Sequence, residues 1–425
     1  MAISNKIISI FLVLFAIISF FTGFYLDEIS MGAGGFNGDF IFVKKSIILF
    51  NENSILNSIK LFSETSNRPP LIYILHKLLN PFYLDEINFR KVVFLISLFV
   101  PILFYFCLSE KFKQVDRNLL LLLSSVIFFN PFFRTSSFWG LEENYAIITT
   151  LASFFFIFKL QDLEYKKSSK LYFIIFLITF FSSLSIYFDQ KFLIIPLFCF
   201  FKIILSELSN KIKFVCFFFY IIFSIPYLFL INLWGGIFPS NIYNIGSQFY
   251  FHHFGYALTI LAFIFFPFIF LKSQKFKDLV LNFVSGKKIL IILLLITFYL
   301  TILFFFYDDS FLNNKLDGGG IIKKISFILF DNLIYKKIFT FLAILISCLF
   351  IFFFIENNKL NLLFTLYFLI LSIIVRPFFQ EYFDPIVFLL VIFLYKIKFK
   401  ITYIKVYFFY FYFLFFLFGT NLYYN

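Results

Sequence analysis

Long uninterrupted runs of apolar residues constrain this chain more than any other feature. Of its 425 residues, 62% are hydrophobic and only 14% are charged, and apolar stretches of about 17–21 residues recur along its length, enough to cross a bilayer as a helix. These runs are continuous and do not alternate with polar residues as the strands of a membrane β-barrel do. The sequence therefore predicts an all-α, polytopic membrane protein.

We expect about 11–13 transmembrane helices in a single integral membrane domain covering residues 1–425, without a separate soluble domain. The candidate spans are 7–25, 92–109, 118–133, 143–159, 171–187, 190–206, 214–233, 255–272, 289–307, 338–355, 360–376, 382–396 and 402–419. Two long segments between spans, 26–91 and 308–337, contain apolar residues on one helical face. They are expected to form amphipathic helices in the membrane interface, at 39–50, 54–62, 69–82 and 321–337.

The formal net charge of +13 is distributed unevenly among the connecting segments. Lysine-rich connections alternate with connections that are poor in Lys and Arg. The lysine-rich set is 110–117, 159–170, 202–213, 272–288 and 395–400. The positive-inside rule places this set and the N-terminus in the cytoplasm, so the charge indicates topology and contact with anionic lipid, with no nucleic acid implied.

The segments on the opposite, external side contain most of the residues that could carry chemistry. Asp27 and Glu28 follow the first span directly. They could be a solvated helix end, but charges at the edge of a membrane core are costly and tend to be functional. Arg68 precedes two prolines that start a short helix well, so it would stand at the positive end of that helix, ready to bind an anion. A plain loop-to-helix junction is the alternative.

Other external segments add polar side chains of the same kind. Residues 130–145 bring Arg134, Glu142 and Glu143. Residues 233–256 are rich in Asn, Tyr and Gly, which offer hydrogen bonds and stacking surfaces to a sugar. That segment also holds two adjacent histidines, but no third ligand has helical spacing to them, so no metal site is expected.

The turn at 375–385 brings five polar or charged side chains together between two spans: Arg376, Gln380, Glu381, Tyr382 and Asp384. Such a group at a narrow membrane mouth is a candidate clamp for an anion or a sugar, with a plain hairpin as the alternative. The cytoplasmic connections contain no phosphate-binding glycine motif, so a cytosolic nucleotide donor is not indicated.

The order of these motifs resembles that of the GT-C glycosyltransferases, and most closely their bacterial mannosyltransferase-like and aminoarabinose-transferase-like branch. These polytopic enzymes use a polyprenyl-phosphate-linked sugar. The likeness rests on "LDE" (26–28), "RPPL" (68–71), "INFRKVVFLIS" (87–97), "WGGIFP" (234–239) and "EYFDP" (381–385). Arg68 stands where the family usually has His.

The resemblance implies a GT-C-like helical bundle in the bacterial inner membrane, with an extracytoplasmic active site. The activity would be inverting transfer of a sugar from a polyprenyl-phosphate donor to a lipid or glycan acceptor. Asp27 would be the general base, and Glu28 would orient the acceptor or hold a divalent cation. No cofactor is fixed by the resemblance.

The same resemblance assigns substrate-binding roles. Arginines would bind the leaving phosphate, tyrosines would hydrogen-bond the phosphate or sugar, and further acids would complete the site. These residues are Arg68, Arg134, Arg376, Tyr73, Tyr382, Glu142, Glu143 and Glu381. We expect them to meet Asp27 in one pocket at the outer edge of the bilayer.

Two other functions stay open at this point. A transporter or flippase of lipid-linked saccharides should carry charged sites near the bilayer midplane and repeated halves, and neither is visible here. A polymerase or ligase of surface polysaccharide should centre on a long late external loop with arginines, and the loop at 308–337 contains none.

Overall fold

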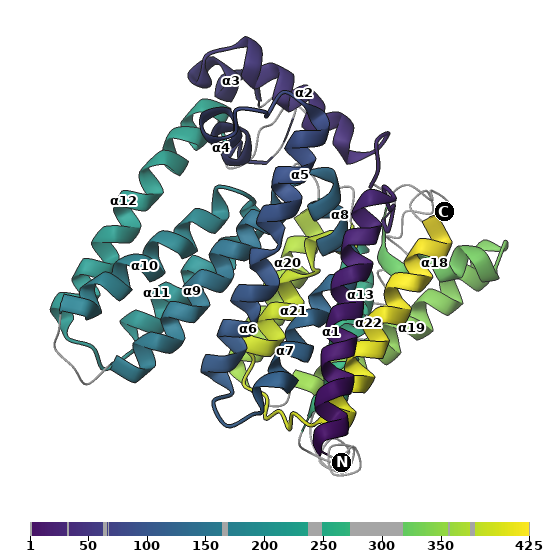
Figure 1. Ribbon diagram of the computed structural model, residues 1–425. Coiled ribbons are helices and arrows are strands. Elements are labelled where there is room, and N and C mark those ends of the chain that lie inside the picture. The colour runs from purple at the N-terminus through teal and green to yellow at the C-terminus, as the bar shows by residue number, and fades with distance from the viewer. Residues whose placement is uncertain are drawn as a thin grey trace. The chain divides into compact units, whose positions relative to one another are not determined.

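The computed structural model describes residues 2–31, 34–62, 66, 68–163, 169–236, 249–272, 318–355, 358–374 and 379–424. Within these ranges the chain is helical and forms no strand, and Lys272 and Phe399 form an isolated bridge. The predicted all-α class is confirmed (Figure 1). Contacts divide the chain into two compact units, one of residues 1–243 with 410–425 and one of residues 244–409.

The first unit is built from helices that follow one another closely along the chain. They are α1 (Ala2–Tyr25), α2 (Asp39–Glu52), α3 (Ile55–Phe62), α4 (Leu71–Leu79), α5 (Glu86–Ser97), α6 (Phe99–Lys111), α7 (Arg117–Ser125), η1 (Val126–Phe129), α8 (Pro131–Trp139), α9 (Glu143–Leu163), α10 (Ser169–Ile186), η2 (Gln190–Leu193), α11 (Ile194–Ile204) and α12 (Asn210–Trp234).

The helices of the second unit come from the later part of the chain. They are α13 (His253–Phe265), α14 (Phe268–Leu271), α18 (Gly320–Leu329), α19 (Leu333–Ile355), α20 (Lys359–Ile374), η3 (Gln380–Tyr382) and α21 (Ile386–Phe393). Helix α22 (Tyr403–Tyr424) begins in the second unit and ends in the first.

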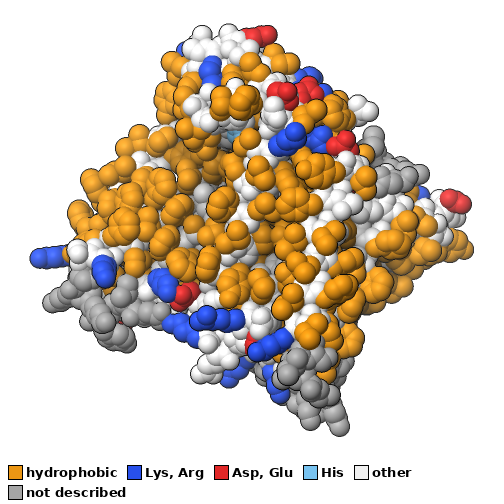
Figure 2. Space-filling model, viewed as in Figure 1, with side chains coloured by type: hydrophobic (Ala, Val, Ile, Leu, Met, Phe, Trp, Pro, Cys, Tyr) orange, Lys and Arg blue, Asp and Glu red, His pale blue; other side chains and the backbone are white. Residues whose placement is uncertain are grey.

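Several helices are long and apolar enough to cross a bilayer, so the chain is a multi-pass membrane protein. Six qualify among the described residues: Asn5–Tyr25, Glu86–Lys111, Ser169–Ile186, Asn210–Trp234, Leu333–Ile351 and Tyr403–Tyr424. Figure 2 shows hydrophobic side chains covering the middle of the first unit's visible face, with charged side chains towards its ends. Such a surface suits a lipid bilayer.

The described helices include fewer full-length spans than the thirteen expected. Helices α13 and α20, predicted as spans 255–272 and 360–376, are apolar but shorter than a span. The predicted span 382–396 holds only the eight-residue helix α21, and the predicted span 190–206 is divided between η2 and α11. The predicted span 289–307 lies outside the described residues.

The predicted span 118–133 is broken, because the chain bends by 66° between Arg117–Phe129 and Pro131–Trp139. Asn130 accepts hydrogen bonds from the backbone N–H groups of Phe132 and Phe133 at 3.0 Å each, and Pro131 occupies the first helical position. Both residues start a new helix rather than continue an old one. Gly140 ends this helix, α8, in the left-handed conformation (φ 76°) that glycine adopts without strain.

Stacked aromatic rings form the core where α1, α5 and α8 meet. The buried ring of Phe20 lies 5.0 Å from that of Phe94 and 5.3 Å from that of Phe133, nearly parallel to both. Phe138 lies 5.1 Å from the same ring. This packing fixes the end of α1, where Asp27 and Glu28 follow.

The helices predicted in the first long segment between spans, 26–91, are confirmed as α2, α3 and α4. Helix α2 buries Phe40, Val43, Ile47 and Phe50 at the spacing of one helical face. Lys77 of α4 donates to the carbonyls of Phe50 at 2.5 Å and Asn53 at 2.6 Å, which satisfies acceptors at the end of α2 that have no helical partner. Their location in the membrane interface stays a prediction.

In the second long segment, the predicted helix 321–337 is interrupted, since α18 ends at Leu329 and α19 begins at Leu333.

A tyrosine repairs the hydrogen-bond ladder of α12 beside a proline. Pro226 lies inside this helix, where its ring distorts the neighbouring turn. The hydroxyl of Tyr187 donates to the carbonyl of Phe223 at 2.5 Å and accepts from the N–H of Tyr227 at 3.0 Å. Tyr187 thereby occupies the place of one direct backbone bond and connects α12 to the end of α10.

We expect Tyr187→Phe to destabilise the protein by about 1–3 kcal/mol, since two backbone groups lose their partner. The measurement is the midpoint of thermal unfolding in detergent, together with hydrogen exchange of the 223–228 backbone. The control is Tyr220→Phe, whose hydroxyl bonds only a side chain of α10, Ser182, at 2.9 Å. Equal exchange of the 223–228 backbone in the two variants would contradict the repair role.

Candidate functional site

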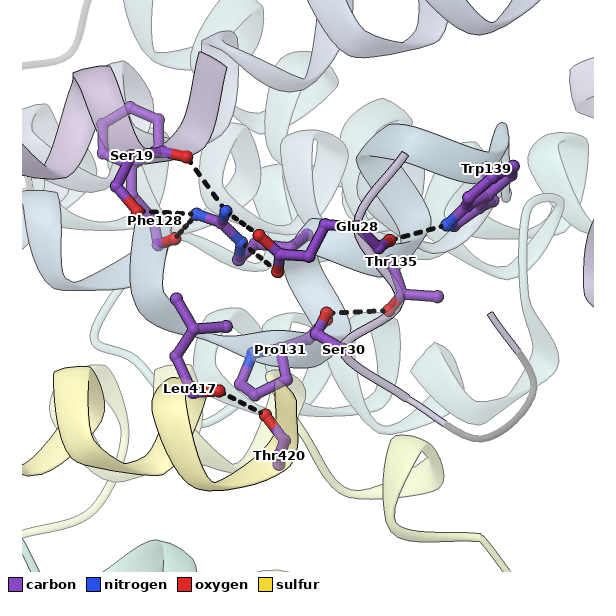
Figure 3. Close-up of polar contacts among 10 residues, drawn as sticks. Ser19, Glu28, Ser30, Phe128, Pro131, Thr135, Trp139, Leu417 and Thr420 are labelled. Carbon is purple, nitrogen blue, oxygen red and sulfur yellow. Dashed lines mark hydrogen bonds and ion pairs between the residues drawn. The ribbon is translucent and has the colours of Figure 1, made fainter. Parts of the chain in front are cut away.

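The short buried helix α8 is the platform on which the first unit's charged residues are assembled. All nine of its residues are buried. Arg134 from its middle holds Glu28 in a two-pronged ion pair, with Nε donating to Oε1 at 2.8 Å and Nη2 donating to Oε2. The remaining donors of the guanidinium bond the carbonyls of Phe128 and Ser19, each at 3.0 Å (Figure 3). Arg134 is thus fully engaged inside the protein.

A glycine in α1 makes room for this ion pair. A Cβ placed on Gly23 would overlap both Nη2 of Arg134 and Oε2 of Glu28. Only a residue without a side chain lets the pair lie against α1.

Gly23→Ala is therefore expected to destabilise the protein by about 1–3 kcal/mol or more, because overpacking displaces a buried ion pair. Thermal unfolding in detergent measures the effect. Gly419→Ala in α22 is a matched control, since a Cβ there meets nothing within 4 Å, and it should be neutral or slightly stabilising. An unchanged unfolding midpoint for Gly23→Ala would mean that the pair tolerates displacement.

Asp27 is the exposed acid of this first cluster. Its backbone is left-handed (φ 51°), which is uncommon for a residue other than glycine. Nη2 of Arg90 binds its Oδ1 at 2.5 Å, while 57% of the Asp27 side chain remains accessible. Arg90 itself is buried, donates from Nε to the carbonyl of Phe138 at 2.7 Å, and lies over the ring of Trp139 at 4.1 Å. The carboxylate of Asp27 is thus held in a fixed orientation yet open on one side.

Further hydrogen bonds tie the segment after α1 to α8. Nε1 of Trp139 donates to the carbonyl of Glu28 at 3.1 Å. The hydroxyl of Ser30 donates to the carbonyl of Pro131 at 3.2 Å and lies 3.3 Å from that of Thr135 (Figure 3). These bonds come from both ends of α8, so the position of Asp27 depends on the whole helix.

A second charged cluster forms around Glu142 and Glu143, which follow α8 in the chain. Nη1 of Arg68 binds Oε1 of Glu142 and Oε1 of Glu143, at 2.5 Å each. Lys191 lies 3.7 Å from Glu143 and 3.1 Å from Asp189. The hydroxyl of Ser136, on α8, donates to Oε2 of Glu143 at 3.2 Å. Apart from Arg68, whose side chain is 23% exposed, the members of this cluster are buried.

Burial, with the neighbouring carboxylate of Glu143, raises the pKa of Glu142 to about 7, even though Arg68 opposes the shift. The folded chain therefore keeps a proton on Glu142 at pH values where the unfolded chain has lost it. The stability contributed by the neutral form is present below pH 4.5 and is lost as pH rises through about 7.

Glu142→Gln should remove this pH dependence. We expect the unfolding midpoint of the wild-type protein to fall more steeply between pH 5 and pH 8 than that of the variant, because glutamine cannot ionise. Glu52→Gln, at an exposed position on α2, serves as the control and should follow the wild-type profile. Parallel profiles for Glu142→Gln and wild type would show that Glu142 ionises normally.

Tyr73, expected to bind substrate, is packed inside the α2–α4 group. Its ring lies 5.8 Å from that of Phe50 and 5.4 Å from that of Phe62. Burial raises the pKa of its phenol far above the usual value, and the side chain of Ser46 hydrogen-bonds it. Tyr73 therefore supports the segment that carries Arg68, and its substrate-binding role stays a prediction.

The remaining predicted site residues fall elsewhere. Glu381 and Tyr382 are half-buried in η3 of the second unit, and Arg376 lies outside the described residues. The two adjacent histidines, His252 and His253, are buried, with Nδ1 of His253 3.1 Å from the carbonyl of Ser372. No group of three or more His, Cys, Asp or Glu side chains able to hold a metal occurs in the described part of the chain.

Three functional candidates are missing from the sequence-based set of site residues. Arg90 lies within the "INFRKVVFLIS" motif and could have been chosen, because an arginine at the start of a span needs a partner. Lys191 lies in one of the connections that are poor in Lys and Arg. Asp189, two residues earlier, accepts from the N–H of Lys191 at 3.0 Å and so fixes the turn that carries it.

Comparisons of this chain with protein-family models, with curated proteins and with solved structures find no match.

Proposed function

We propose that this protein is a membrane glycosyltransferase that moves a sugar from a polyprenyl-phosphate donor to a lipid or glycan acceptor, with Asp27 as general base. The observation that supports the proposal most is the contrast among the acids of the two clusters. Asp27 is 57% exposed and oriented by a buried arginine, whereas Glu28, Glu142 and Glu143 are enclosed by cations. One carboxylate is free to meet a substrate, and its neighbours hold it in place.

In the proposed reaction, Oδ2 of Asp27 accepts the proton of an acceptor hydroxyl. The hydroxyl oxygen forms a bond to the anomeric carbon of the donor sugar as the bond from that carbon to the phosphate oxygen breaks. Attack from the face opposite the phosphate inverts the configuration. Because Arg90 binds Oδ1, Oδ2 is the oxygen left for the substrate. The acceptor hydroxyl is thereby oriented towards one defined oxygen of Asp27.

The leaving polyprenyl phosphate needs a cation, and Arg68 suits this role better than Arg134. Arg134 is 1% exposed and bonded throughout, while the side chain of Arg68 is 23% exposed. Arginine binds phosphate through two parallel hydrogen bonds. In the proposal Arg68 binds the phosphate, and Arg134 positions Glu28.

The proposal places this site on the extracytoplasmic face of a bacterial inner membrane, where the isoprenoid tail of the donor can stay in lipid. Reporter fusions test the orientation. Fusions at Ser66 and Gly246 should report the outside and one at Ser168 the inside. A cytoplasmic signal from Ser66 would reject the proposed location of the site.

Deletion of the gene tests the activity itself. The transferase proposal predicts accumulation of a polyprenyl-phosphate-linked monosaccharide, since the donor is no longer consumed. Accumulation of complete lipid-linked oligosaccharides would instead indicate a flippase, a polymerase or a ligase.

A further inference from the structure

Three consecutive glycines open helix α18 in the second unit. Gly318, Gly319 and Gly320 all have positive φ angles, of 75°, 90° and 73°. No side chain caps the helix that follows. The first backbone N–H groups of an α-helix have no partner within it and lie at the positive end of the helix dipole. The start of α18 therefore presents several donors to an anion (α18 is labelled in Figure 1).

The neighbouring side chains approach the glycine backbone closely. A Cβ on Gly320 would lie 2.6 Å from Cγ1 of Ile260, and a Cβ on Gly319 would lie 2.5 Å from Cδ of Lys323. Glycine is thus required here both for the backbone conformation and for space. Turns of this kind bring backbone N–H groups together as an anion-binding concavity.

A buried amide side chain lies against the same turn. The amide of Gln380 lies against Gly320, with its Oε1 3.7 Å from the position a Cβ would take. Gln380 is only 8% exposed, and its Nε2 is buried without a hydrogen-bond partner in the described part of the chain. A buried donor left in this state costs about 1–3 kcal/mol. Such a group calls for an explanation, and a ligand that accepts its hydrogen bond supplies one.

Lysines lie in α18 and in the helix that follows it. Lys323 and Lys336 are buried, and their ammonium groups lie 5.9 Å and 4.2 Å from the centre of the Phe327 ring. Lys324 follows in the same helix, and burial lowers its pKa to about 8, so it keeps its charge at neutral pH. Lys323 is the lysine closest to the glycines, since its Cδ lies against the position of a Cβ on Gly319.

We propose that the start of α18, with Gln380 and Lys323, binds a phosphate group. The phosphate would accept hydrogen bonds from the backbone of Gly319 and Gly320 and from Nε2 of Gln380, with Lys323 balancing its charge. The ligand is a phosphate ester of a lipid or free inorganic phosphate, since both offer the same oxygens. This inference rests on the second unit alone and does not depend on sugar transfer.

Isothermal titration of the purified full-length protein in nanodiscs tests the site, with inorganic phosphate and farnesyl phosphate as separate probes. We expect at least one of them to bind, and Gln380→Leu to weaken binding about tenfold, which corresponds to about 1.4 kcal/mol. Binding of farnesyl phosphate alone would assign the site to a lipid headgroup. Binding of inorganic phosphate at equal strength would assign it to the phosphate itself.

Two controls keep the test decisive. Lys359→Met, at an exposed lysine of α20, should leave binding unchanged, whereas Lys323→Met should weaken it. Hydrogen exchange of the backbone N–H groups at 319–322 in the wild-type protein should slow when the probe that binds is added. This measurement needs no variant. The proposal is overturned if neither probe binds, if Gln380→Leu binds as tightly as the wild type, or if exchange at 319–322 does not change.

Discussion

Asp27→Asn is expected to lower the rate of sugar transfer by about 10²–10⁴-fold, the contribution of a positioned general base. The amide nitrogen and oxygen of asparagine cannot accept the proton of the acceptor hydroxyl, while the shape of the side chain is kept. The loss should fall on kcat more than on KM, because the carboxylate acts mainly as the proton leaves. The measurement is the initial rate of transfer from a polyprenyl-phosphate-linked sugar in isolated membranes.

Asp85→Asn provides the matched control for that experiment. Asp85 is exposed and caps α5 by accepting from the N–H of Asn88 at 2.9 Å. Asparagine caps a helix as well as aspartate does, so this variant should retain full activity and stability. Retained activity of Asp27→Asn, at equal protein level, would remove Asp27 from the base role.

Arg134→Met is expected to destabilise the protein by about 3–5 kcal/mol, the cost of leaving a buried charge without its partner. Arg134 is buried, and it holds a Glu28 side chain that is only 13% exposed. The methionine side chain fills much of the space but leaves Glu28 and the carbonyls of Ser19 and Phe128 without their donor. The unfolding midpoint in detergent measures the effect.

A second variant distinguishes the ion pair from simple packing. In the double variant Glu28→Gln/Arg134→Met the charge of Glu28 is gone, so stability should recover in part. Arg117→Met, at an exposed arginine at the start of α7, should change little. A double variant that is less stable than Arg134→Met would show that the charge of Glu28 is not what the arginine stabilises.

The membrane character and most helices could be predicted from the sequence because apolar length is a local property. Runs of apolar residues form helices in lipid wherever they occur, and α2, α3 and α4 follow from amphipathic spacing in the same way. The break between η1 and α8 was missed because hydropathy averages over it. Asn130, Pro131 and Gly140 are each strong start or stop signals, and giving them precedence over hydropathy would have placed α8 correctly.

The charged clusters were predicted only in part, because ion pairing depends on contacts between distant segments. The sequence selected Asp27, Glu28, Arg68 and Arg134 as important but paired none of them. Glu28 and Arg134 are 106 residues apart, and only the buried position of α8 brings them together. Within the first unit these ion pairs form two clusters, each bonded to a residue of α8, and the single pocket expected from the sequence stays a prediction.

The most direct test of the account is the release of free polyprenyl phosphate by the purified wild-type protein in proteoliposomes. The protein is supplied with a mixture of radiolabelled polyprenyl-phosphate-linked sugars extracted from a deletion strain, together with the acceptor lipids of that strain. The account predicts that free polyprenyl phosphate appears only when the acceptor lipids are present, and that Asp27→Asn does not release it. Absence of release by the wild-type protein, or equal release by the variant, would contradict the account.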